Sequence, residues 1–271
     1  MMQAPLKTQF PKSLAQKSPA LRAIHLLREL YLFILSLYPT RRVRRLKRSK
    51  SSDLRVVVIP GLMASDRSMR PMRLALRAAG FRTYRWCLGR NTGATPALLD
   101  QFDARVRRIQ HADPRPVILV GWSLGGLIAR EYAKHAPERV AAVVTLGSPF
   151  SGDISAMVVA RLYEWVAGHA ISALPIACAL SEKPPVPTAA IWSHNDGVVA
   201  PLCARGQAPE ADCQIEVSCA HLAYPWDAGA LSAVIEAIER CRTVAEQSIT
   251  APAVGQTHRL AVDPQRQAQA A

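Results

Sequence analysis

Short apolar segments alternate with longer segments of helical periodicity from Leu54 to about residue 245. Six segments have the length and the aliphatic composition of strands, namely residues 55–59, 81–87, 117–120, 140–146, 188–193 and 214–218. Apolar positions at helical spacing predict helices at residues 67–79, 96–111, 127–136 and 228–241. Strands that alternate with helices form a parallel sheet that is covered on both faces. The pattern therefore predicts an α/β fold with a mostly parallel sheet.

Two stretches depart from this alternation. Residues 154–180 are apolar and rich in alanine, and they lie between two predicted strands. Such folds insert a cap over the site at this position, and a packed helical pair fits the same composition, so we expect a small helical cap at about residues 153–183. Residues 246–271 are rich in Ala, Gln and Pro without periodicity, which favours a disordered tail. We thus expect an N-terminal segment at 1–50, an α/β domain at 51–245 and this tail.

The positive charge of the chain is concentrated at its N-terminus. The formal net charge is +14 at pH 7, and residues 1–50 hold 12 Lys and Arg against the single acidic residue Glu29. Residues 51–271 hold 22 basic and 19 acidic residues and are nearly balanced. Because nucleic-acid binding needs a basic face on the folded domain itself, the composition argues against a nucleic-acid partner.

The N-terminal segment combines an apolar helical stripe with a basic cluster. Leu26, Leu30, Phe33 and Leu37 recur at helical spacing, and seven Lys and Arg follow between residues 41 and 50. The apolar run is too short to span a bilayer, which takes about 20 residues. One interpretation is an interfacial helix within residues 21–50 that lies on an anionic membrane surface. The other is a helix that packs on the domain, followed by a solvated basic linker.

Location and redox state follow from targeting signals and cysteine spacing. Neither an ordinary export signal nor a twin-arginine signal fits the N-terminal segment, so we expect a cytoplasmic protein, peripheral at the inner membrane if residues 21–50 bind lipid. The six cysteines form no C-x-x-C pair and show no metal-ligand spacing with the histidines. We therefore expect reduced thiols, no metal and no cofactor. Cys203 and Cys213 bracket a loop that a disulfide could close in an exported protein.

The segment Gly121-Trp122-Ser123-Leu124-Gly125 joins a predicted strand to a predicted helix. In a nucleophile elbow, a glycine-x-serine-x-glycine turn holds the serine hydroxyl above the edge of the sheet. The motif alone occurs by chance in many proteins, but here the flanking strand and helix supply the structural context. The sequence therefore predicts Ser123 as a nucleophile.

A serine hydroxyl needs a base that takes its proton and an acid that orients the base. Asp196 lies in a turn directly after the fifth predicted strand, and His221 lies in the loop after the sixth. The carboxyl ends of parallel strands meet at one edge of a sheet, so Ser123, Asp196 and His221 can converge there. His194 is the rival base. The fallback acids are Asp153, Asp212 and Asp227.

Hydrolysis through a serine also needs two donors for the oxyanion. One donor is expected to be the backbone N–H of Leu124, the residue after the nucleophile. The other is expected from the loop after the first strand, Ile59-Pro60-Gly61-Leu62-Met63, where Gly61 allows close approach and Leu62 is the best candidate.

These motifs resemble the α/β-hydrolase superfamily, and within it the bacterial lipases and esterases. The resemblance runs from about residue 55 to residue 242 and rests on residues 59–62, 88–93, 121–126, 145–149 and 193–199 and on the stretch around His221. It implies that Ser123 is the nucleophile, Asp196 the acid and His221 the base. It also implies an oxyanion hole made by the amides of Leu62 and Leu124.

One position departs from the family pattern. Many such lipases have His-Gly where this chain has Pro60-Gly61. Because the donor is a backbone amide, the change need not abolish activity, but it affects how the loop is anchored. The Gly-Arg-Asn-x-Gly sequence at residues 89–93 is a candidate anchor for a loop near the site.

The leading functional hypothesis is a serine hydrolase that cleaves a small-molecule carboxylic ester with an apolar acyl group, through an acyl-enzyme on Ser123. A second hypothesis keeps the acyl-enzyme but makes the protein an acyltransferase or thioesterase. A third is a non-catalytic membrane-surface binding protein of this fold, since fold does not fix function. A complete serine, acid and histidine set argues against the third.

Overall fold

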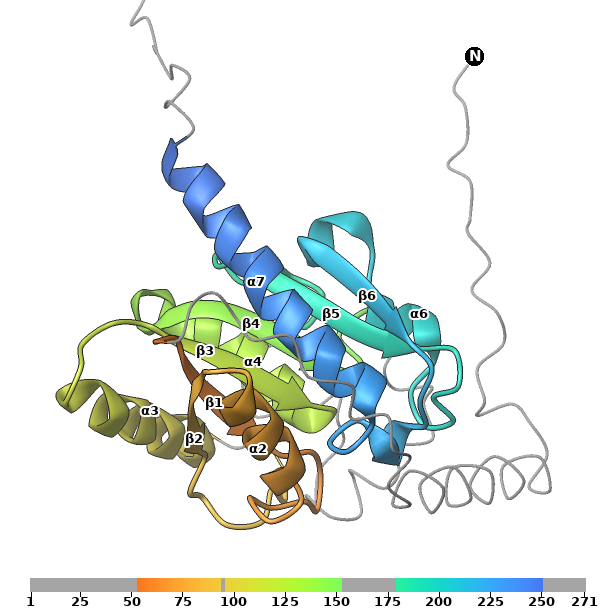
Figure 1. Cartoon of the computed structure of the whole chain (residues 1–271), viewed down its shortest axis with the longest axis horizontal. Helices are drawn as coiled ribbons and strands as arrows, with labels where there is room; N and C mark the ends of the chain where they lie inside the picture. The colour runs from red at the N-terminus through yellow and green to blue at the C-terminus, as the bar shows by residue number, and fades with distance from the viewer. Residues whose placement is uncertain (1–52, 94–95, 153–178, 251–271) are drawn as a thin grey trace, which may run out of the picture.

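The computed structural model describes residues 53–93, 96–152 and 179–250. In these ranges the chain forms one sheet of six parallel strands in the order β2-β1-β3-β4-β5-β6, shown in Figure 1. The strands are β1 (Arg55–Ile59), β2 (Arg82–Arg85), β3 (Val117–Trp122), β4 (Val140–Leu146), β5 (Thr188–Ser193) and β6 (Cys213–Val217). The prediction of an α/β fold with a parallel sheet is confirmed.

Helices cover both faces of this sheet. The helices are α2 (Arg70–Ala78), α3 (Pro96–His111), α4 (Leu124–His135), α6 (Pro201–Arg205) and α7 (Ala228–Thr250). Val56 and Val58 of β1 belong to the core that contains α2 and α7, whereas Val57 and Ile59 belong to the core that contains α3 and α4. In Figure 1, α2 and α7 lie in front of the sheet and α4 lies behind it. Successive strand side chains point to opposite faces, so a strand buried on both faces reads as a continuous apolar run.

Three helix boundaries differ from the sequence prediction by three residues or more. Helix α2 begins at Arg70 rather than residue 67, because hydrogen-bonded turns precede it and Pro71 occupies its first turn, where proline is favoured. Helix α4 begins directly after Ser123, three residues earlier than expected. Helix α7 continues to Thr250, so the first residues of the predicted tail are helical. The remaining tail residues lie outside the described ranges.

Several short elements between the strands and helices were not anticipated. Helix α6 starts with Pro201 and ends at Arg205, and the φ of 72° at the following Gly206 stops the helix. Three 3₁₀ turns complete the described fold, namely η2 (Pro137–Arg139), η4 (Ala208–Glu210) and η5 (His221–Ala223). These pieces are too short for hydrophobic periodicity to reveal them.

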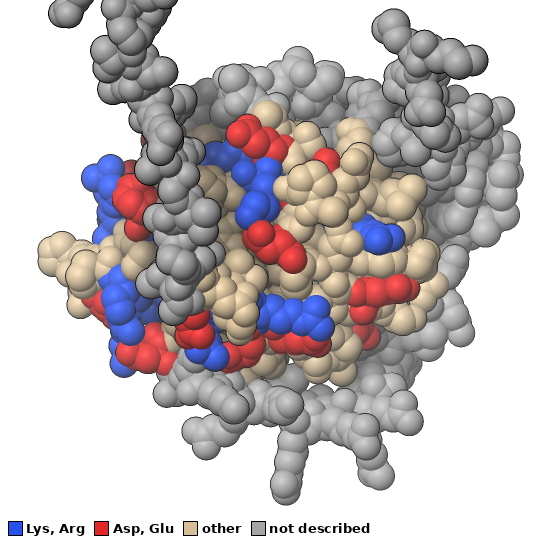
Figure 2. Space-filling model, turned by 90° about the horizontal axis from the view of Figure 1, so that it is seen from above, with Lys and Arg blue, Asp and Glu red and all other residues tan. Residues whose placement is uncertain are grey.

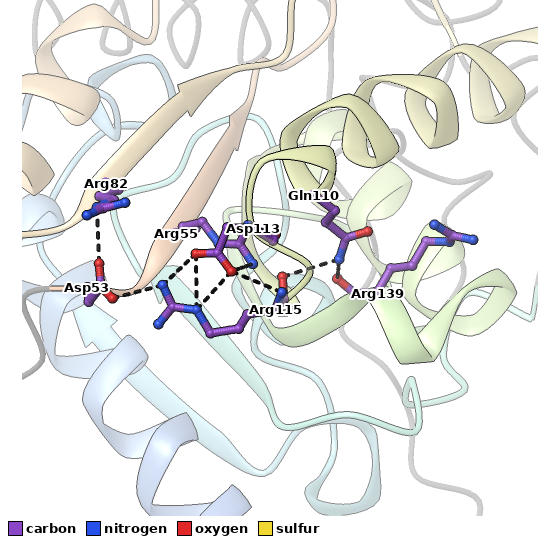
Figure 3. Close-up of polar contacts among 7 residues, drawn as sticks. All are labelled: Asp53, Arg55, Arg82, Gln110, Asp113, Arg115 and Arg139. Carbon is purple, nitrogen blue, oxygen red and sulfur yellow. Dashed lines mark hydrogen bonds and ion pairs between the residues drawn. The ribbon is translucent and has the colours of Figure 1, made fainter.

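The amino ends of the strands are tied together by ion pairs and hydrogen bonds (Figure 3). Asp53 bridges Arg82 at 3.1 Å and Arg115 at 2.8 Å, and Arg115 also pairs with Asp113. This pairing holds the pKa of the Asp113 carboxyl well below its usual range. The buried Arg55 of β1 donates to the backbone carbonyl of Asp113. These contacts lie at the amino edge of the sheet, and the predicted site residues lie at the opposite, carboxyl edge.

The described domain carries charges of both signs. On the face shown in Figure 2, Lys and Arg side chains lie next to Asp and Glu side chains. No helix within the described ranges is both long enough and apolar enough to cross a bilayer. The N-terminal segment and most of the expected cap lie outside these ranges.

The described residues do not contain the disulfide that Cys203 and Cys213 could form in an exported protein. Cys213 is a free thiol, so the bridge to Cys203 is not formed. Cys241 is also a free thiol, and its burial raises the pKa of this group to about 12. A thiol with so high a pKa carries little thiolate at neutral pH and is chemically inert.

Candidate active site

Ser123 occupies the turn between β3 and α4 with a strained backbone. Its φ is 54° and its ψ is −120°, a conformation that L-residues rarely adopt. The backbone N–H of Ser123 donates to the carbonyl of Leu146 at 2.8 Å, which ties the turn to the end of β4. This backbone conformation places Ser123 at the N-terminus of α4, as a nucleophile elbow requires.

The elbow depends on a close approach between α4 and β1. A Cβ atom on Gly125 would lie 2.6 Å from the carbonyl oxygens of both Ile59 and Pro60. Only glycine fits at that distance, because the neighbouring atoms are backbone. The first turn of α4 therefore lies directly against the loop that carries Leu62.

Asp196 and His221 form a buried pair at the carboxyl ends of β5 and β6. Asp196 Oδ2 lies 2.7 Å from His221 Nδ1, and the two side chains are 0% and 5% exposed. The other carboxylate oxygen of Asp196 accepts hydrogen bonds from the backbone N–H groups of Val198 and Val199, at 2.9 and 2.7 Å. Three bonds thus fix the orientation of the carboxylate, and the carboxylate in turn orients the imidazole.

The pair lies beside the elbow. The indole N–H of Trp122, the residue before Ser123, donates to the carbonyl of His221 at 3.1 Å. A Cβ atom on Gly147, next to the Leu146 carbonyl that Ser123 contacts, would lie 2.9 Å from Asp196 Oδ2 and 3.2 Å from His221 Nδ1. Short links therefore connect the serine turn to both members of the pair.

Ser193 holds the loops of the acid and the base together, and sequence reasoning missed it. Its buried hydroxyl donates to the carbonyl of Cys219 at 2.7 Å and accepts from the N–H groups of Asn195 and Cys219, at 3.0 and 3.2 Å. Asn195 precedes Asp196, and Cys219 lies two residues before His221. A serine as the last residue of an apolar strand is the only sequence signal for this role.

The rival candidates are engaged elsewhere. The side chain of His194 is 67% exposed and pairs with Glu216 at 2.5 Å. Asp212 binds Lys183 and the N–H of Thr188. Asp227 accepts from the N–H of Ala230 in the first turn of α7. Asp153 lies outside the described residues.

The two predicted oxyanion donors come from the two segments that meet at Gly125, the start of α4 and the loop after β1. Leu124 is the first residue of α4, so its N–H has no intrahelical acceptor. Leu62 is a central residue of a turn closed by a hydrogen bond from Ala64 N–H to the Gly61 carbonyl at 3.1 Å. Within the described residues, neither the Leu62 nor the Leu124 N–H has a recorded acceptor.

Arg130 is a second residue that the sequence did not single out. It is fully buried, and its guanidinium donates to the carbonyls of Ser181, Glu182 and Glu210 and lies 4.1 Å from the ring centre of Phe150. Burial lowers the pKa of Arg130 to about 10. The contacts tie α4 to described residues on both sides of positions 153–178.

No group of three or more His, Cys, Asp and Glu side chains in the described ranges could hold a metal ion. The arrangement that the structure does hold is a strained serine, a buried aspartate and histidine pair, and two backbone donors. Chemically, such a set can move a proton from a hydroxyl and stabilise an oxyanion.

Comparisons with known proteins agree with this geometry at the level of fold. The model of the alpha/beta hydrolase fold family matches residues 44–175. A pimeloyl-[acyl-carrier protein] methyl ester esterase of Salmonella heidelberg (strain SL476) is 42% identical over 60 residues, which cover 22% of each chain. The matched part therefore spans about a fifth of that relative's length.

Two solved structures are similar over most of the chain. One comes from work on LipS and LipT, two metagenome-derived lipolytic enzymes, with a TM-score of 0.56, 17% identity, and coverage of 74% of this chain and 98% of that chain. The other is MGS-MChE2, an alpha/beta hydrolase enzyme from the metagenome of lagoon sediments at Mar Chica, Morocco, with a TM-score of 0.52, 22% identity, and coverage of 73% and 94%. At these identities the likeness concerns the fold alone.

Proposed function

Because the chain belongs to the α/β-hydrolase superfamily, we propose that it is a serine hydrolase that cleaves carboxylic esters. The observation that carries the proposal is the 2.7 Å contact between Asp196 Oδ2 and His221 Nδ1, buried beside the Trp122-Ser123 elbow. The short match to a methyl ester esterase supports the same class of bond.

The first half of the reaction forms an acyl-enzyme. Ser123 Oγ attacks the ester carbonyl carbon while His221 Nε2 takes the hydroxyl proton. Asp196 keeps the Nδ1–H of His221 in place and stabilises the imidazolium that forms. The N–H groups of Leu62 and Leu124 bind the oxyanion of the tetrahedral intermediate. The intermediate collapses, and the departing alkoxide leaves as the alcohol with the proton from His221.

The second half releases the acid. A water molecule gives a proton to His221 and attacks the acyl carbon, and the same two amides bind the second oxyanion. Collapse breaks the bond to Ser123 Oγ, which recovers its proton from His221. The substrate in this proposal is a small ester with an apolar acyl group. Half-buried Leu62 and the exposed Met63, which is 39% exposed, give the loop beside the site an apolar rim.

The test is a series of p-nitrophenyl esters from short to long acyl chains, given to the wild type and to Ser123→Ala. We expect turnover by the wild type and a loss on the order of 10⁶ in the variant, since the nucleophile and base act as a unit. A fluorophosphonate probe should label the wild type at Ser123 alone. Equal turnover by both proteins would overturn the assignment of the nucleophile.

Two further measurements separate the alternatives. Absence of labelling and of turnover in the folded wild type would favour a non-catalytic protein of this fold. Acyl transfer to added alcohols or thiols in preference to water would favour an acyltransferase. A preference for thioesters over oxygen esters of the same acyl group would favour a thioesterase.

A further inference from the structure

The loop after β2 is fastened to the loop after β1, on both sides of Leu62. The Met63 N–H donates to the carbonyl of Asn91 at 2.7 Å, and the Asn91 N–H donates to the carbonyl of Ala64 at 2.9 Å. Arg90 adds a bond from its guanidinium to the Met63 carbonyl at 2.7 Å. These bonds fix Met63, whose φ of 60° is costly for a side chain with a Cβ.

The side chain of Asn91 supplies the link on the other side. Asn91 is 1% exposed, and its Nδ2 donates to the carbonyl of Pro60 at 2.7 Å while its Oδ1 accepts from the N–H of Gly93 at 3.3 Å. Pro60 is two residues before Leu62, and its carbonyl oxygen faces Gly125 at the start of α4. One residue therefore holds the loop at positions 60, 63 and 64, around Leu62, one of the two residues whose amides are expected to bind the oxyanion.

The Asn91 loop is itself braced. The carboxylate of Asp66 accepts from the N–H groups of Trp86 and Cys87, both at 3.1 Å. The indole N–H of the fully buried Trp86 donates to the carbonyl of Gly89 at 3.0 Å. Asn91 thus lies on a supported loop, so its side-chain amide can hold the Pro60 carbonyl in a fixed position.

We propose that Asn91 is a positioning residue that aims the Leu62 N–H at the oxyanion, an inference that rests on the proposed function. A donor is effective only 2.7–3.1 Å from the place where the oxyanion forms, and removing one such donor costs roughly 10²–10³ in kcat. The ground-state ester gains little from that donor. Displacement of the loop therefore lowers kcat and leaves KM nearly unchanged.

Two variants test the role. Asn91→Asp keeps the shape but replaces the donor to the Pro60 carbonyl with a carboxylate oxygen, and Asn91→Ala removes the side chain. The matched control is Thr83→Val, which removes a buried hydroxyl between β2 and α2 that accepts from Arg77 at 2.8 Å. Thermal melting measures the stability lost in each protein, and titration with a fluorophosphonate counts competent Ser123 sites.

For both Asn91 variants we expect kcat per titrated site to fall by about 10²-fold or more, with KM within about threefold of the wild type. An alkyl boronic acid, which becomes tetrahedral on Ser123, should lose affinity by a similar factor. Thr83→Val should show neither effect. The inference is wrong if the rate lost equals the sites lost, if KM rises in place of the fall in kcat, or if boronate affinity is unchanged. Absence of hydrolysis and labelling in the wild type would instead overturn the proposed function and this inference with it.

Discussion

At the scale of single residues, His221 and His194 differ in what their rings contact. His221 is buried against Asp196, whereas His194 is exposed and pairs with Glu216. The sequence placed both after strand ends, and only the order of serine, acid and histidine favoured His221. Which way a loop side chain points depends on packing across the sheet, which the local pattern does not encode.

The base and the acid are tested by His221→Ala and Asp196→Asn, with His194→Ala as the control. We expect the His221 change to cost on the order of 10⁶ in ester turnover and the Asp196 change roughly 10⁴, since histidine shares the nucleophile's step. His194→Ala should keep near wild-type turnover. A strong loss in His194→Ala together with an active His221→Ala would show that the base is misassigned.

Ser193 allows a prediction at the same scale. Ser193→Ala leaves the N–H and carbonyl of Cys219 and the N–H of Asn195 without the hydroxyl that they share. A hydrogen bond of this kind contributes about 0.5–1.5 kcal/mol, so the loss of these three bonds should lower the free energy of unfolding in urea by about 1 kcal/mol or more. The matched control is Ser232→Ala, which removes an exposed helical hydroxyl. Equal stability of the two variants would mean that the loops hold without this bridge.

At the scale of elements, the buried strands and the starts of α3 and α7 were predictable, whereas the start of α4 and the end of α7 were not. A strand buried on both faces is a run of apolar residues, so β1, β4 and β5 have the predicted bounds. The first turn of α4 contains Gly125 and Gly126, whose low helix propensity hides it from a periodicity argument. The end of α7 is polar, and pairs such as Arg242 with Glu246 support it in place of apolar contacts.

The crossing of α4 and β1 is tested by Gly125→Ala. Its added methyl would lie 2.6 Å from two backbone carbonyl oxygens, so the helix or the strand must move. Overpacking of this kind typically costs 1–3 kcal/mol, and here it also displaces Pro60 and the loop of Leu62. We expect lower stability in urea unfolding and a fall in kcat.

The matched control is Gly229→Ala in α7. Its added methyl would meet the side-chain oxygen of Asp227 at 3.0 Å, and a side chain can yield where a backbone carbonyl cannot. Its unfolding free energy should stay within about 1 kcal/mol of the wild type, because alanine favours a helix over glycine by a similar amount. If both variants behave alike, the close approach at Gly125 is not limiting.

At the scale of the whole molecule, the amino and carboxyl edges of the sheet differ in the residues that they carry. Ion pairs around Asp53 and Arg115 link the starts of β1, β2 and β3 at the amino edge, and the carboxyl edge carries the candidate site. The order β2-β1-β3 reverses the direction of winding at β1 and β3, the place where open α/β sheets bind ligands. The sequence predicts that the strand ends gather, but not which strands are neighbours, because pairing depends on contacts between distant segments.

The division of charge predicts that residues 1–50 govern location and that the chemistry lies elsewhere. All candidate site residues lie beyond residue 59, and the first ion pair of the domain is made by Asp53. A chain that begins at Ser51 should therefore fold and hydrolyse soluble esters at the rate of the full-length protein. Loss of solubility or activity in the shortened chain would show instead that residues 1–50 are part of the fold.

The full-length protein should bind vesicles that contain anionic lipid, and the chain from Ser51 should not. Each basic residue near the surface contributes on the order of 1 kcal/mol, so part of the cluster is enough once the apolar stripe inserts. Added salt should weaken binding, because exposed charges are screened within about 10 Å at 0.1 M.

A full-length variant with Arg41, Arg42, Arg44 and Arg45 changed to Gln separates the effect of charge from that of the apolar stripe. Sedimentation with anionic and with neutral vesicles measures the binding of all three proteins. Equal sedimentation of the full-length and shortened chains would remove the membrane role from this segment, and equal binding of the Gln variant would assign it to the apolar stripe alone.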